Sequence, residues 1–235
     1  MATFVGVDGC KLGWFAVWQG SRGLKARIYP SVQELWCEHA DATRILIDVP
    51  IGLKVTEDRF IESKVRALLG PRRSSVFPVP CHGAAYADNY PDASAVNRSI
   101  LGKGLSKQAW FITPLIRDVD QLLQQNRQAQ AVLGECHPEL AFATINGAPL
   151  QNSKKTAEGV AIRQTLIRKH FRAVDRFIET CLREHPRRHL QIDDCLDAMV
   201  LLITAKQARP LSETNESGKG DIPIRIWVPD RASYY

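Results

Sequence analysis

Apolar and polar positions near the N-terminus follow a pattern that predicts three short strands. Residues 3–8 and 13–18 are dominated by apolar and small side chains, and residues 24–29 continue the pattern after a second turn. Gly9 separates the first two segments, and the stretch 20–23 contains two further glycines. Because glycine is the usual residue of tight turns, we expect these strands to form an antiparallel meander.

Two later apolar runs predict further strands of the same sheet. In residues 44–48, Arg44 leads into a continuous apolar run that ends in an aspartate, which is typical of a strand buried on both faces. Residues 131–136 form a similar strand that ends before His137–Pro138. Between the strands, Ser31 is a good N-cap for a helix to about residue 37. The sequence therefore predicts an α/β fold with a mixed five-stranded sheet flanked by helices.

Helical periodicity and stop signals place most of the other elements. Helices are expected at 57–69, 91–101, 154–170, 173–184 and 192–205, and a short strand at 224–228. Thr113 followed by Pro114 predicts a helix that begins there. The proline-rich and glycine-rich stretch from 54 to 113 is interpreted as an insertion that packs on one edge and borders the site. We expect one domain over residues 1–235.

Composition narrows the class of protein. Hydrophobic residues make up 45% and charged residues 24%, and the longest strongly apolar run, 198–203, is too short to span a bilayer. With no secretory signal at the N-terminus, we expect a cytoplasmic protein without membrane contact. The six cysteines form no C-x-x-C pair, which argues against a zinc site. A net charge of +6, with arginines and lysines gathered in 59–73, mildly favours a partner that carries phosphates.

Carboxylates lie where strands end and on one face of the last helix. Asp8, Asp48 and Glu135 each fall near the end of a strand, whereas Asp194 and Asp197 are three residues apart and share a helix face. A buried carboxylate is costly unless it is paired or binds a metal. If the strands are neighbours, the acids converge opposite that helix face, and such hard oxygen ligands select Mg²⁺ or Mn²⁺.

Each acid also has a simpler explanation. Asp8 could form a turn with its own backbone, and Asp48 could cap a loop. Asp193 is most simply the N-cap of the final helix. Glu135 could pair with an arginine of the insertion.

Six motifs occur along the chain in the same order as in one protein family. They are G-V-D-G-C-K-x-G-W at 6–14, I-D-V-P-I-G-L at 47–53, R-x-S-S-V-F-P-V-P at 72–80, G-x-S-K-Q-A-W at 104–110, E-C-H-P-E at 135–139 and D-D-C-L-D-A at 193–198. They are similar to the DUF429 family, described as predicted ribonuclease H-like nucleases. The order of elements resembles the ribonuclease H superfamily, and the last helix looks like that of RuvC-type resolvases. The resemblance implies a ribonuclease H-like fold in which Asp8, Asp48, Asp194 and Asp197 bind metal, with Glu135 near them.

The resulting hypothesis is a nuclease that hydrolyses phosphodiester bonds in nucleic acid. Two metal ions about 3.5–4 Å apart would activate water and stabilise the leaving oxygen. All five acids would be catalytic, and substrate contacts are expected at Arg72, Arg73, Gln108, His137 and Lys155. Lys155 could equally be a solvated residue at a helix start.

Two rival functions remain open from the sequence. One is a phosphotransferase or ATPase of the actin and sugar-kinase superfamily, whose fold also opens with a strand, an aspartate and a glycine turn. The other is a non-catalytic nucleic-acid or protein binding module. The sequence does not decide the substrate or the oligomeric state.

Overall fold

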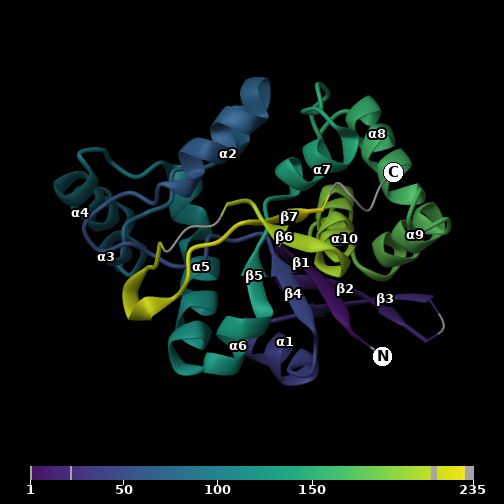
Figure 1. Ribbon diagram of the computed structural model, residues 1–235, viewed down its shortest axis with the longest axis horizontal. Helices are drawn as coiled ribbons and strands as arrows, with labels where there is room; N and C mark the ends of the chain where they lie inside the picture. Colours follow the sequence, from purple (N-terminus) through teal and green to yellow (C-terminus); the bar gives the residue numbers. More distant parts are fainter. Residues whose placement is uncertain (1, 22, 213–215, 231–235) are drawn as a thin grey trace.

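A mixed five-stranded sheet forms the centre of the molecule (Figure 1). The computed structural model describes residues 2–21, 23–212 and 216–230. The strands are β1 (Phe4–Cys10), β2 (Gly13–Gly20), β3 (Gly23–Tyr29), β4 (Arg44–Ile47) and β5 (Leu133–Glu135), in the order β3-β2-β1-β4-β5. β1, β2 and β3 form the predicted antiparallel meander, although residue 22 of its second turn lies outside the described residues. β4 and β5 add in parallel, which confirms the mixed α/β fold class.

Helices cover both faces of the sheet (Figure 1). One face packs against α1 (Val32–His39), α5 (Lys107–Gln125) and α6 (Arg127–Val132). The other packs against α7 (Pro138–Asn146), α8 (Ala157–Arg168), α9 (Val174–Glu184) and α10 (Ile192–Lys206). Side chains alternate between the two faces along a strand, so Ile45 and Ile47 join the first core while Leu46 joins the second.

The predicted insertion lies to one side of the sheet, beyond α5 (Figure 1). Residues 54–113 form α2 (Ile61–Leu69), the 3₁₀ turn η1 (Gly70–Ser75), α3 (His82–Ala85), α4 (Tyr90–Leu101) and the first turns of α5. Ile61, Val65 and Leu69 of α2 pack against residues near the C-terminus, including Ile224 and Val228. The insertion is thereby fixed to the body of the molecule by a small core of its own.

The expected closing strand is shorter than predicted and lies beside β5. β7 (Trp227–Pro229) pairs antiparallel with β6 (Ala208–Pro210), and Ile226 makes an isolated parallel bridge to Glu135. Among the described residues, none of the helices combines the length and the apolar character needed to cross a membrane.

The prediction that a helix begins at Thr113 is wrong. α5 begins at Lys107, where the Ser106 hydroxyl accepts a hydrogen bond from the Ala109 N–H at 3.1 Å. Pro114 therefore lies inside the helix and cannot donate to the Trp110 carbonyl one turn earlier. The Thr113 hydroxyl donates to that carbonyl instead, at 2.8 Å. Thr113 thus supplies the hydrogen bond that Pro114 cannot make, and the pair lies in the interior of a helix rather than at its start.

Short helices account for the other differences from the predicted elements. The strand expected at 131–136 is reduced to Leu133–Glu135, because the residues before it belong to α6. α7 directly follows β5, and neither it nor α3 was expected. α2 starts at Ile61 rather than at residue 57. The final helix begins at Ile192, as predicted.

Candidate functional site

Helix α10 rests directly on β1 at Gly6. A Cβ atom added to Gly6 would lie 2.1 Å from the Ala198 carbonyl oxygen and 2.2 Å from the Leu202 nitrogen. Both atoms are backbone, so only glycine allows this approach. The missing side chain therefore fixes where α10 sits on the sheet.

This contact brings acids from three elements to one place. Asp8 lies two residues after Gly6 on β1, so its side chain faces α10. Asp197 immediately precedes Ala198 on that helix, and burial leaves only 2% of its surface exposed. Asp48 follows β4, and its N–H donates to the Val7 carbonyl at 3.0 Å. Asp8, Asp48 and Asp197 are close enough for their charges to influence one another, as the sequence predicted.

A lysine that the sequence analysis did not select lies among these acids. The Lys154 ammonium donates to Asp197 Oδ2 at 2.5 Å and lies 3.7 Å from Asp193 Oδ2. Asp197, Asp8 and Asp48 all act to raise the pKa of Lys154 above its ordinary value. Lys154 sits in the turn before α8, whose N-cap is Thr156. One signal was present in the sequence, namely that a group of buried acids needs a nearby cation.

The acids are only partly neutralised by this lysine. Burial, followed by repulsion from Asp197 and Asp48, holds the pKa of Asp8 well above its ordinary value despite Lys154. Burial likewise raises the pKa of Asp48 and of Asp197. It raises the pKa of Asp194 from 3.8 to about 6. The cluster therefore gains from any further positive charge.

Asp193 and Asp194 have partners in the first turn of α10. Asp193 is not the N-cap, because Gln191 occupies that position. Asp193 instead accepts a hydrogen bond from the Lys155 ammonium at 2.7 Å. Asp194 Oδ2 accepts the Gln191 N–H at 2.8 Å, which leaves its other oxygen for a further interaction. Asp197 is thus the acid of this helix most closely tied to Asp8 and Asp48.

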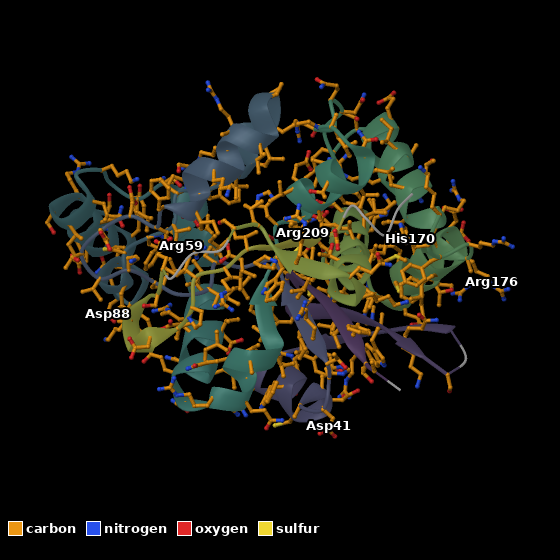
Figure 2. The ribbon with its side chains drawn as sticks, viewed as in Figure 1. Asp41, Arg59, Asp88, His170, Arg176 and Arg209 are labelled. Atoms are coloured by element: carbon orange, nitrogen blue, oxygen red, sulfur yellow. The ribbon has the colours of Figure 1, made fainter. Side chains whose placement is uncertain are left out.

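Glu135 is paired with the insertion, although it also lines the cavity that Asp8 and Asp48 line. Its register partner on β4 is Ile47, whose side chain faces the opposite core from Leu46. Glu135 Oε2 accepts from Arg59 Nη2 at 2.7 Å and from the Ile51 N–H at 2.8 Å. This is the arginine pairing that the sequence left open. Figure 2 shows Arg59 on the insertion side of the molecule.

The expected substrate-binding residues are dispersed. Arg72 donates to Glu139 at 3.0 Å, so it is already paired. Arg73 and Gln108 are exposed on η1 and at the start of α5. Lys155 is 63% exposed beside Asp193. His137 borders a cavity that Asp8 and Asp48 also line. Of the five, His137 is the one that shares a cavity with these acids.

The donor chemistry of the cluster fits a hard divalent cation, although the side chains do not form a finished site as they stand. Within 2–21, 23–212 and 216–230, no group of three or more His, Cys, Asp or Glu side chains could hold a metal ion as positioned. Carboxylates alone favour Mg²⁺ or Mn²⁺ over softer metals. At present the Lys154 ammonium supplies the positive charge beside Asp197.

Comparison with protein families assigns the chain to one family. The model of DUF429, described as a protein of unknown function, matches residues 6–215. The chain belongs to the DUF429 family. The match begins in β1, two residues before Asp8, and continues past α10, so it includes every acid of the cluster. No curated protein and no solved structure matches this DUF429 chain.

Proposed function

We propose that this DUF429 protein is a ribonuclease H-like, divalent-metal-dependent hydrolase of phosphodiester bonds in nucleic acid. The observation that carries the proposal is the convergence of Asp8, Asp48 and Asp197 from β1, β4 and α10, with charge left uncompensated. A three-stranded meander followed by two parallel strands and a final helix supports the fold assignment. The basic character of the chain, with a net charge of +6, suits a phosphate-bearing substrate.

The metal, Mg²⁺ or Mn²⁺, would be held by Asp8, Asp48 and Asp197. The Asp194 oxygen that does not accept from Gln191 would be a further ligand. When bound, the metal would supply Lewis-acid stabilisation of charge and would lower the pKa of a bound water. Lys154 would leave Asp197 as the metal charge replaces its own. Its ammonium would then be available to donate to a phosphate oxygen of the substrate.

Hydrolysis assays with matched aspartate variants test this function. We expect Mn²⁺-dependent cleavage of a fluorescent oligonucleotide by the wild-type protein and a loss of about a hundredfold or more in Asp8→Asn and Asp197→Asn. Asp120→Asn is the control, since Asp120 is also buried but bonds to Tyr86 and Gln124. Equal cleavage by Asp8→Asn and wild type, or no cleavage of single-stranded, hybrid or branched substrates with either metal, would refute the proposal.

A second candidate is a DUF429 module that binds its partner without catalysis. It is favoured by one observation, the Lys154–Asp197 ion pair, which already places a cation among the acids. In that case calorimetric titration with Mn²⁺ gives no heat of binding. A saturable heat that disappears in Asp197→Asn excludes this candidate.

A further inference from the structure

A cavity of about 190 Å³ opens beside the acid cluster. Asp8 and Asp48 line it together with residues of the insertion. Pockets for drug-sized ligands are larger, about 300–1,000 Å³. The cavity therefore has room for a single ring system next to the carboxylates.

The walls of the cavity are mainly apolar. Val65 and Val76 line it from α2 and the loop after η1, and Ile112 and Leu115 line it from α5. Phe77 also lines the cavity while 39% of its surface remains exposed, which places an aromatic face at the boundary with solvent. Aromatic side chains at such positions stack on flat rings, and nucleic-acid bases are the common example.

Most of the polar side chains of the wall are carboxylates, which accept hydrogen bonds when they are ionised. They belong to Asp8, Asp48, Glu62 and Glu135. His137 Nε2 lies 3.2 Å from the Ser75 carbonyl, so it is the protonated nitrogen and Nδ1 is an acceptor. His137 Nδ1 is buried and makes no hydrogen bond within the described part of the chain. Because His137 lines the cavity, a ligand N–H that reaches Nδ1 would give this atom a hydrogen-bond partner.

We propose that the cavity binds one unpaired nucleobase that carries an amino group, namely adenine, cytosine or guanine. A base inside a duplex is stacked and paired, so it cannot enter an enclosed cavity unless it leaves the helix. Uracil and thymine present one N–H between two carbonyl oxygens, which would face the acceptors of the wall. The inference rests on the proposed function and narrows its substrate to nucleic acid that is unpaired beside the acids.

Nucleoside binding in the presence of a chelator tests the cavity without the metal or the hydrolysis. At pH 8 the Glu62 carboxyl, whose pKa burial raises to about 7, is mostly ionised. We expect saturable binding of adenosine and cytidine by saturation-transfer NMR, and about tenfold weaker binding of uridine. Phe77→Ala should weaken adenosine binding about tenfold through the lost stacking.

Phe60→Ala is the matched control, because Phe60 is an exposed aromatic of the insertion, 77% accessible, that does not line this cavity. His137→Phe should abolish the preference for adenosine over uridine. The proposal is overturned if no nucleoside binds, if uridine binds as well as adenosine, or if both phenylalanine variants lose binding equally. Nucleoside binding without any metal-dependent cleavage would support the nucleobase cavity and refute only the proposed hydrolase activity.

Discussion

The Lys154 ammonium lies close to carboxylates from β1, α10 and the residue after β4. It bonds to Asp197, and the charges of Asp8 and Asp48 also favour its protonated form. A cation held in this way competes with any metal for the same carboxylates. Its side chain is 35% exposed, so it has a route into solvent when a metal arrives.

Replacing Lys154 separates its role as the ion-pair partner of Asp197 from its role as a competitor of the metal. We predict that Lys154→Met binds Mn²⁺ about tenfold more tightly than wild type, because the competing charge is gone. Without metal the variant should melt at a lower temperature, since Asp197 loses its ion-pair partner. Because the Lys154 side chain is 35% exposed, solvent screening keeps this cost below the roughly 3–5 kcal/mol of a fully buried pair. Isothermal titration and thermal unfolding measure the two effects. Lys155→Met is the control, and tighter binding in both variants, or weaker binding in Lys154→Met, would contradict the competition.

The raised pKa of Asp8 has a consequence for stability. A carboxyl whose folded pKa is raised stabilises the fold while it is protonated, and that contribution is lost as the pH rises through the folded pKa. We therefore predict that metal-free Asp8→Asn melts at least about 2 °C above wild type at pH 8, a shift that roughly 1 kcal/mol would produce. The gain should shrink as the pH falls toward 4. A melting temperature for Asp8→Asn at or below that of wild type at pH 8 would show that Asp8 is not under electrostatic strain.

At the scale of elements, the contact between β1 and α10 determines the site. Gly6 lets the two backbones meet, and the alternation along β1 then directs Asp8 toward the helix. The spacing of Gly6 and Asp8 and the helical spacing of Asp194 and Asp197 were both readable in the sequence. Their convergence could be predicted because strand and helix periods are fixed by the backbone. The position of Lys154 could not, since it lies in a turn whose path depends on the packing of α8.

The β1–α10 contact can be tested with one methyl group. We predict that Gly6→Ala destabilises the protein by about 3 kcal/mol or more, because the added Cβ meets backbone atoms that cannot rotate away. Chemical denaturation measures the loss. In the control Gly83→Ala the new Cβ would lie 3.2 Å from a Val96 side-chain atom and nothing closer, so a small effect is expected. Equal stability of Gly6→Ala and wild type would mean that α10 does not lie against β1 as described.

Two elements show where local signals were insufficient. Thr113–Pro114 has the sequence of a helix start, but the buried face of α5 extends about one turn further back, to Ala109. Glu135 has the position of a site acid and lines the cavity beside Asp8 and Asp48, but its register places it with Ile47, where it pairs with Arg59. In both cases tertiary contacts, which a single sequence does not display, decide between two local interpretations.

At the scale of the whole molecule, the sheet and the insertion form the two sides of the site. The meander strands and the final helix were predictable because their patterns are long and regular, whereas only the last three residues before Cys136 form β5. The cavity could not be predicted, since its wall is built from residues far apart in sequence, such as Val65, Val79 and Leu115. The insertion was expected to border the site, and its residues Val65 and Val79 line the cavity beside Asp8 and Asp48.

A crystal structure of the protein soaked in Mn²⁺ tests the central claim most directly. The account predicts an anomalous peak bonded to Asp8 and Asp197, with the Lys154 ammonium withdrawn from Asp197. A control crystal of Asp197→Asn should lack that peak. If saturating manganese leaves no peak and the Lys154–Asp197 ion pair stays intact, the acid cluster is not a metal site and the proposed hydrolase is wrong.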